Sequence, residues 1–243
     1  MKQRSGETLK RFGIIGNPLG HSYSEAYFTD KFAREAIAAV YEPHAIKDID
    51  QVREFIDVLE GFNVTYPYKE SIMSYLSELD DTARSIGAVN VVKQGKGYNT
   101  DWLGFSDSLR PLLTEHDQRA LLLGTGGVSK AIQYALKQIG IAYTLVSRSA
   151  KADAITYAEI NEQVLEQHRI IVNCTPLGMA PYTGQKPDLP YHLLSSQHLL
   201  YDCIYNPAKT AFLLAGEEQG CRIQNGLQML HLQADYAWQI WNS

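Results

Sequence analysis

The chain has 243 residues, of which 45% are hydrophobic and 20% charged, and its formal net charge is −5 at pH 7. These values are typical of a globular protein with one large or two small cores. The negative charge, without a basic cluster, disfavours nucleic-acid binding, and no apolar run is long enough to cross a bilayer. Three cysteines without paired spacing predict free thiols, no metal site and a cytoplasmic protein, and we expect no signal peptide at residues 1–11.

The first hundred residues alternate between strand and helix patterns. The expected elements are strands at 11–16, 41–46 and 61–65, helices at 24–40, 50–59 and 68–79, and a hairpin at 88–92 and 97–100. A helix at 102–113 is expected to lead into the second half of the chain. This order predicts a first α/β domain.

Polar residues follow several of these strands, at the edge where open α/β sheets bind ligands. Ser22 and Ser24 come after the first strand, and two hydroxyls beside a helix start can hold a carboxylate, although Ser24 is also a plausible N-cap. Lys69 follows the third strand, and its position by itself favours a surface charge. The hairpin adds Asn90, and Asp101 follows its second strand.

The second half opens with a complete β-α-β pattern at 119–124, 128–139 and 142–147. Between the first strand and the helix lie Gly124, Gly126 and Gly127, which let backbone N–H groups approach a pyrophosphate at a helix N-terminus. The third glycine of the dinucleotide-binding motif is replaced by Ser129. The pattern predicts a Rossmann-like, doubly wound domain.

The end of the second strand of this unit indicates which dinucleotide is bound. An acidic residue would hold the ribose hydroxyl of NAD, but this stretch reads Ser147, Arg148, Ser149. A guanidinium pairs bidentately with a phosphate, so Arg148 favours NADP, although a solvated arginine at a strand end is the simpler alternative. Lys151 is a second basic residue nearby.

Eight sequence blocks, in this order, resemble the shikimate dehydrogenase family over almost the full length. They are GNPLGHSYS (16–24), NVTYPYK (63–69), GAVN (87–90), NTDWLG (99–104), GTGG (124–127), VNCTPLGM (172–179), YDCIYNPAKTAFL (201–213) and GLQMLHLQADYAW (226–238). The resemblance implies an NADP-dependent reduction of 3-dehydroshikimate to shikimate in aromatic amino-acid biosynthesis. It departs from the family at Glu25, where a proline is usual, and at Lys151, which is out of alignment and is expected to weaken the preference for NADP.

The resemblance also implies roles for individual residues. The substrate-binding residues would be Ser22, Ser24, Thr65, Asn90, Tyr205 and Gln233. The cofactor-binding residues would be Gly124, Thr125, Gly126, Gly127, Val128, Ser147, Arg148, Ser149, Cys203 and Gly226. The mostly neutral donors and acceptors agree with a small, polyhydroxylated acid as the ligand. We expect a substrate-binding domain at 1–101, completed by a C-terminal helix at 226–243, and an NADP-binding domain at 102–225.

Lys69 and Asp101 are the expected catalytic pair. A lysine ammonium can donate a proton to the alkoxide that forms when a ketone accepts a hydride, and a carboxylate can orient it. Charged lysine serves poorly as the base of the reverse reaction, so it can also act electrostatically, with a water or a substrate hydroxyl relaying the proton.

Three alternatives remain open at the level of sequence. The first is a quinate or aminoshikimate dehydrogenase, possibly using NAD. The second is another two-domain NADP enzyme acting on a folate or an aldehyde, and the third is a non-catalytic regulatory protein that binds shikimate or a nucleotide. We expect a monomer or homodimer whose ligands are small molecules, with no nucleic-acid or membrane partner.

Overall fold

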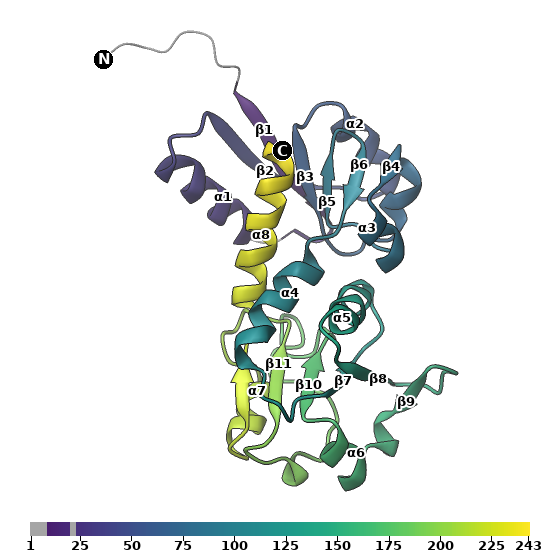
Figure 1. The fold of residues 1–243 in the computed structure, drawn as a ribbon. Coiled ribbons are helices and arrows are strands. Elements are labelled where there is room, and N and C mark those ends of the chain that lie inside the picture. The colour runs from purple at the N-terminus through teal and green to yellow at the C-terminus, as the bar shows by residue number, and fades with distance from the viewer. Residues whose placement is uncertain (1–8, 20–22) are drawn as a thin grey trace. The chain divides into compact units, whose positions relative to one another are not determined.

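The computed structural model describes residues 9–19 and 23–243 (Figure 1). The chain divides into two compact units, which we call the first unit (Met1–Thr100 with Ala234–Ser243) and the second unit (Asp101–Gln233). The C-terminal return to the first unit thus begins at Ala234 rather than at the expected residue 226. The reason is packing, because Met229 is buried in the hydrophobic core of the second unit.

The first unit is built on a six-stranded sheet in the order β2-β1-β3-β5-β6-β4. Its elements are β1 (Lys10–Gly16), α1 (Tyr23–Arg34), β2 (Ala39–Ala45), α2 (Arg53–Ile56), β3 (Gly61–Val64), β4 (Glu78–Leu79), α3 (Asp81–Ile86), β5 (Val91–Lys93) and β6 (Lys96–Tyr98). Strand β1 pairs in parallel with β2 and β3, whereas β5 runs antiparallel to both β3 and β6. The carboxyl ends of β1, β2 and β3 therefore lie at one edge of the sheet.

One face of this sheet is covered by aromatic side chains from α1 and from the end of the chain. The ring of Phe12 on β1 stacks on Trp241 with centroids 5.0 Å apart, and Phe28 of α1 stacks on Tyr41 at 4.6 Å. The indole N–H of Trp241 donates to the carbonyl of Val92 at 3.1 Å. Ala234, Ala237 and Trp241 from the last ten residues thus belong to the first unit's core.

Three helical segments of the first unit differ from the expectation. Helix α1 ends at Arg34 instead of continuing to residue 40, because the chain turns at Ala36, whose φ is 54°. The expected helix 50–59 is a 3₁₀ turn followed by the short α2. The expected helix 68–79 is wrong: it is a 3₁₀ segment, Ser71–Tyr75, followed by β4, which pairs with β6. Strand pairing overrides the helical spacing of the apolar residues there.

The second unit contains an all-parallel sheet in the order β12-β11-β10-β7-β8-β9. Its elements are α4 (Asp101–Leu109), β7 (Arg119–Leu123), α5 (Gly127–Gln138), β8 (Ala142–Ser147), β9 (Ala154–Thr156), α6 (Glu162–Gln167), β10 (Ile170–Asn173), β11 (Leu199–Asp202), α7 (Ala211–Glu217), β12 (Arg222–Gln224) and α8 (Leu227–Asn242). The strand order reverses between β7 and β10, which is the ligand-binding switch point of doubly wound sheets. The expected two-part α/β fold with a Rossmann-like domain is confirmed.

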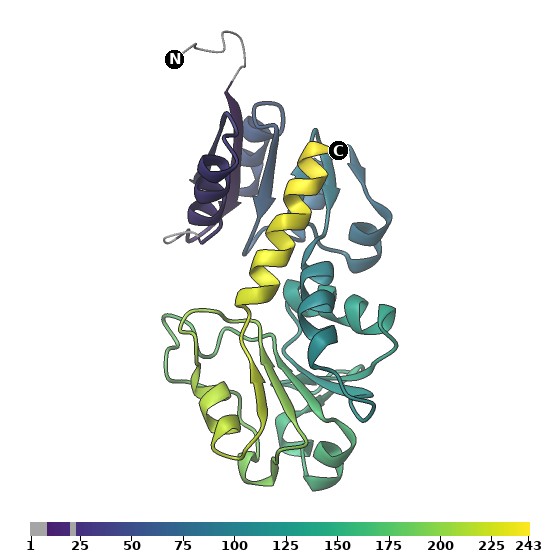
Figure 2. The ribbon, with the colours of Figure 1, turned by 60° about the vertical axis from the view of Figure 1, so that its left-hand side comes forward.

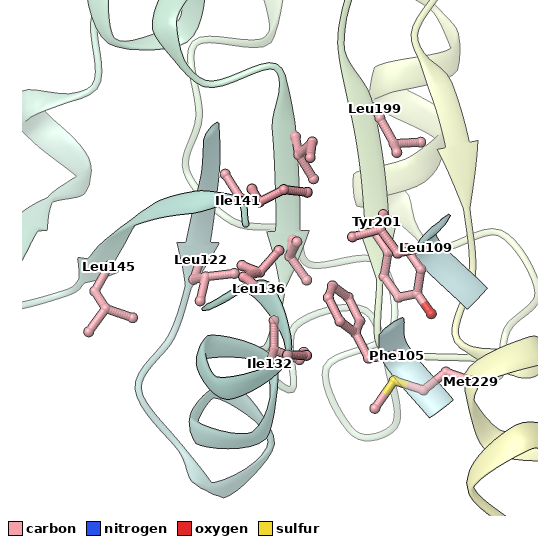
Figure 3. Packing of buried hydrophobic residues seen from close by; sticks show 14 residues of the cluster. Phe105, Leu109, Leu122, Ile132, Leu136, Ile141, Leu145, Leu199, Tyr201 and Met229 are labelled. Atoms are coloured by element: carbon pink, nitrogen blue, oxygen red, sulfur yellow. The ribbon is translucent and has the colours of Figure 1, made fainter. Parts of the chain in front are cut away.

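Helices cover both faces of the second unit's sheet. Phe105 of α4, Ile132 of α5 and Tyr201 of β11 belong to a buried cluster on one face (Figure 3). Leu165 of α6 and Phe212 of α7 belong to the cluster on the opposite face. Side chains from alternate positions of the same strands enter the two clusters, as expected for a sheet buried on both sides.

Helix α8 is one continuous helix, drawn in yellow in Figure 2, although its residues belong to both units. Among residues 9–19 and 23–243, no helix combines the length and the apolar character that a bilayer crossing requires.

Candidate functional site

In the first unit, Asn90 lies at the edge of the sheet formed by the carboxyl ends of β1 and β3, and its side chain is hydrogen-bonded to Thr100. Its amide nitrogen donates to Oγ1 of Thr100 at 3.0 Å, and its Oδ1 accepts the backbone N–H of Thr100 at 2.7 Å. Only 2% of Asn90 is exposed. These bonds fix the backbone directly before Asp101, the next residue in the sequence.

A chain of buried hydrogen bonds connects Ser24 with the Asn90 backbone. The Ser24 hydroxyl bonds to the Tyr41 hydroxyl, which donates to Oδ1 of Asn63 at 2.7 Å. The amide of Asn63 in turn donates to the carbonyl of Asn90 at 3.2 Å. Burial raises the pKa of Tyr41 well above its ordinary value, so its hydroxyl keeps the proton that it donates.

Sequence reasoning missed Tyr41 and Asn63, although the block beginning at Asn63 was noted. Their side chains come from the two strands that flank β1, and they can meet only because β2 and β3 both pair with β1 in parallel and in a fixed register. The signal available in the sequence was a polar residue within each of two buried strand patterns.

Lys69 and Thr65 lie at the same sheet edge as Asn90. The carbonyl of Lys69 accepts the backbone N–H of Val89 at 2.7 Å, and Val89 precedes Asn90. Thr65 follows β3 and donates its N–H to the carbonyl of Ile15 at 2.9 Å. The structure therefore brings Ser24, Thr65, Lys69 and Asn90 together around one strand edge, whereas Ser22 lies outside the described residues.

In the second unit, the glycine loop joins β7 to α5 at the sheet's switch point. Gly124 has φ of 103°, a conformation that favours glycine, and a Cβ there would meet Thr175 and the carbonyl of Cys174. Gly126 is the N-cap residue of α5, no side chain caps this helix, and a Cβ on Gly126 would meet nothing within 4 Å. The backbone N–H groups of the first turn, at Gly127 and Val128, therefore have no side-chain cap and lie next to the open space at Gly126.

One of the basic residues that follow β8 contacts this loop. Ser147 is buried, whereas Arg148 and Ser149 are exposed. The ammonium group of Lys151 donates to Oγ1 of Thr125 at 3.0 Å, which brings this lysine to the glycine loop. Lys151, although out of alignment with the family pattern, is thus positioned beside the residues expected to bind a nucleotide phosphate.

The carboxyl ends of β10 and β11 are joined by a buried pair that sequence reasoning did not single out. The amide of Asn173 donates to Oδ1 of Asp202 at 3.1 Å, while Thr210 and the backbone of Ile204 also donate to this carboxyl. Burial raises the pKa of Asp202 to about 6, against the effect of these three bonds. Asn173 also accepts from Thr175, so the pair orders both following loops.

Cys203 and Gly226 are in direct contact in the second unit. A Cβ on Gly226 would lie 2.2 Å from the carbonyl oxygen of Cys203, so only glycine permits this approach. The N–H of Gly226 donates to the carbonyl of Ile204 at 3.0 Å. Tyr205 follows directly and is half-buried.

Asp101 and Gln233 are both buried, at 5% and 7% exposure. Asp101 begins α4, and Gly104 lies one turn later on the same face. A Cβ on Gly104 would be 2.6 Å from the carbonyl of Met229 and 3.0 Å from the nitrogen of Gln233. The close approach of α4 and α8 at Gly104 therefore brings Gln233 near the beginning of α4.

Known proteins share this architecture. The family model for the shikimate dehydrogenase substrate binding domain matches residues 14–92. A protein named shikimate dehydrogenase (NADP(+)) from Caldicellulosiruptor saccharolyticus is 34% identical over 96% of this chain and 92% of its own. The crystal structure of shikimate dehydrogenase from Aquifex aeolicus matches 96% of this chain and 92% of its own with a TM-score of 0.85 and 33% identity. That of shikimate 5-dehydrogenase from Thermus thermophilus in complex with NADP(H) and shikimate matches 96% and 93% with a TM-score of 0.85 and 28% identity.

Proposed function

This chain belongs to the shikimate dehydrogenase family, and from that premise we infer that it catalyses the NADP-dependent, reversible reduction of 3-dehydroshikimate to shikimate. The reaction serves aromatic amino-acid biosynthesis. We assign the substrate to the first unit with the C-terminal helix and the cofactor to the second unit. A cytoplasmic location and a monomer or homodimer are parts of the same proposal.

The residues of the glycine loop fit a dinucleotide. The first turn of α5 has no side-chain cap and adjoins open space at Gly126, so its N–H groups can bind a pyrophosphate. Arg148 and Lys151 supply the positive charge that a ribose phosphate requires, and Ser147 and Ser149 supply hydroxyls. We assign the nicotinamide end to the segment that contains Cys203 and Gly226.

The substrate residues form two groups by chemistry. Ser22 and Ser24, with Thr65 and Tyr205 nearby, offer hydroxyls to the substrate carboxylate. We assign the ring hydroxyls to Asn90, Gln233 and the catalytic pair. The hydrogen-bond chain through Tyr41 and Asn63 supports this assignment, because it fixes Ser24 and the Asn90 backbone before a ligand arrives.

Lys69 and Asp101 carry the proton in this proposal. When bound, NADPH supplies the hydride for the ketone carbon. The Nζ of Lys69 donates a proton to the oxygen that becomes the alcohol and stabilises its developing charge. Asp101 accepts a substrate hydroxyl bond and orients the ammonium group. The Asn90–Thr100 bonds hold the chain on the N-terminal side of Asp101, so the carboxylate starts from a fixed backbone.

The observation that carries the proposal is the preorganised edge around Asn90, Thr100 and Lys69 in a chain of this family. Steady-state oxidation of shikimate and of quinate, each with NADP and with NAD, tests it. We expect shikimate with NADP to have the highest kcat/KM, and Arg148→Ala to lower kcat/KM with NADP more than with NAD. Preferred oxidation of quinate with NAD would overturn the assignment of shikimate and NADP. Binding of shikimate and NADP without any oxidation would overturn the assignment as an enzyme.

A further inference from the structure

Two of the three cysteines stand side by side at the carboxyl edge of the second unit's sheet. Strands β10 and β11 pair in parallel up to Asn173 and Asp202, and Cys174 and Cys203 are the next residue on each strand. The pairing continues there, because the N–H of Cys203 donates to the carbonyl of Asn173 at 3.1 Å. Both side chains lie on the face of the sheet that carries the cluster around Phe105.

The two thiols also interact directly. A hydrogen bond with Cys174, together with burial and the carboxylates of Asp202 and Asp101, raises the pKa of the Cys203 thiol above its ordinary value. Adjacent strands lie about 4.8 Å apart, which is within the Cα separations of roughly 4.4–6.8 Å at which disulfides form. As residues, Cys174 and Cys203 are partly exposed, whereas Cys221 is buried.

The backbone of this pair touches the two segments that we assign to the cofactor. A Cβ on Gly124 would lie 3.3 Å from the carbonyl oxygen of Cys174, and a Cβ on Gly226 would lie 2.2 Å from that of Cys203. Forming a disulfide replaces the hydrogen bond between the two sulfurs by a shorter covalent bond, so both side chains must rotate about backbone that contacts the glycine loop and the Gly226 segment. The carbonyl of Cys203 is packed too closely against Gly226 to move toward that segment.

We propose that Cys174 and Cys203 are a redox-reactive dithiol, which a peroxide converts into a reversible disulfide that abolishes NADP binding. The thiol–disulfide chemistry goes beyond the proposed function, whereas its effect on activity rests on the proposed cofactor site. The expected form in a reducing compartment is the dithiol, which is the active state.

The reaction is balanced by the peroxide itself. The sulfur of Cys174 attacks one oxygen of hydrogen peroxide, the O–O bond breaks, and the products are a sulfenic acid and water. The sulfur of Cys203 then attacks the sulfenic sulfur, the S–O bond breaks, and a second water leaves with the remaining proton. Two thiols lose two electrons and two protons, and one peroxide becomes two waters. Because Cys203 holds its proton tightly, Cys174 reacts first.

The first measurement counts thiols and does not depend on enzymatic activity. After peroxide treatment and unfolding, we expect the number of titratable thiols to fall from three to one, with the intact mass lower by two hydrogen atoms. Dithiothreitol should restore all three. A trivalent arsenical such as phenylarsine oxide, which needs two neighbouring thiols, should bind the reduced chain and fail to bind Cys174→Ser. Three thiols after treatment, or an arsenical that binds Cys174→Ser equally well, would overturn the proposal.

The second measurement is NADP binding by titration calorimetry before and after oxidation. We expect the oxidised chain to lose binding and to regain it with dithiothreitol, whereas oxidised methionines would not be reduced by this reagent. Cys174→Ser, compared with its own untreated form, should keep its affinity after treatment. Cys221→Ser is the matched control, because Cys221 is buried in the cluster on the opposite face and should leave the wild-type response unchanged.

The outcomes separate this proposal from the proposed function. A disulfide that leaves NADP affinity unchanged would overturn the switch, whatever the enzyme's substrate. A reduced chain that binds NADP but does not oxidise shikimate would overturn the proposed function and leave the thiol result standing.

Discussion

The two units differ in how they form the edges that we propose to bind ligands, at the carboxyl ends of their parallel strands. In the first unit, buried neutral side chains form the edge, as in the chain of hydrogen bonds from Ser24 through Tyr41 and Asn63. In the second unit, backbone atoms form it. A side chain at Gly226 would collide with the carbonyl of Cys203, and Gly124 has a φ of 103° that favours glycine. An edge lined by side-chain donors and acceptors can distinguish the hydroxyls of a small ring. An edge lined by backbone can come close to a phosphate and to a flat ring.

The largest effect should come from the charged side chain of the first unit. Lys69→Ala should lower kcat by about 10²–10⁴-fold with a much smaller change in KM, because it removes a proton donor rather than general binding. Steady-state kinetics with shikimate and NADP measures this. Lys47→Ala, an exposed lysine of the same unit, is the control and should retain wild-type kinetics. A raised KM with an unchanged kcat would remove Lys69 from the chemistry.

The backbone edge of the second unit predicts a steric effect. Gly226→Ala places a Cβ 2.2 Å from the carbonyl oxygen of Cys203 and should lower the free energy of unfolding by about 3 kcal/mol through forced backbone movement. Gly126→Ala, where the added methyl group meets nothing within 4 Å, should cost no more than about 1 kcal/mol, which is the cost of an alanine at the N-cap. Urea denaturation compares the two variants. Equal losses of unfolding free energy in the two variants would mean that the close packing around Gly226 does not determine the cost.

The second unit's edge also contains one buried carboxyl, and it should make stability depend on pH. The pKa of Asp202 is about 6 in the folded chain against an ordinary value of 3.8, so the folded state binds more protons between these values. Its contribution is therefore fully present below about pH 4 and is lost as the pH rises through about 6, by on the order of 3 kcal/mol. Urea denaturation across this range should give a flatter profile for Asp202→Asn. Parallel profiles would mean that Asp202 is not the titrating group.

The smallest effect should come from the neutral hydrogen-bond chain of the first unit. Tyr41→Phe leaves Oδ1 of Asn63 without its donor in a buried position and should cost about 1–2 kcal/mol of unfolding free energy. It should also raise KM for shikimate, since Ser24 loses its partner. Tyr75→Phe is the control, because that hydroxyl bonds Asp50 at the exposed surface and should contribute little. If both variants have the same unfolding free energy and the same KM, the buried hydrogen bonds of Tyr41 do not position the residues at this edge.

The sequence predicted the parts of the fold that local patterns determine. Buried apolar runs gave β1, β3 and β7, and the spacing from Val128 to Ile139 gave α5 within one or two residues of its bounds. The failures came where distant pairing decides. Residues 68–79 have helical spacing, yet their last part pairs with β6 as a strand. The pairing of β4 with β6 cannot be predicted from the local sequence of either segment.

The same distinction holds for the candidate site. The sequence motifs predict Lys69, Asn90 and the glycine loop, because polar residues or glycines there follow buried strand patterns. The sequence does not predict the residues that support the site. Asn63 and Tyr41 meet only through the register of their strands. Gly104 is needed only because α8, more than a hundred residues later in the sequence, packs against it. The catalytic and binding roles themselves stay predictions.

The division of the chain has a consequence for its synthesis. The second unit is continuous in sequence, whereas the first unit needs residues 234–243 to complete its aromatic cluster with Trp241. On the ribosome, residues 1–100 emerge early but cannot close that cluster until the whole of the second unit has been made. The unit that begins first is thus completed last, and its exposed aromatic face is the part of the nascent chain most in need of protection from aggregation.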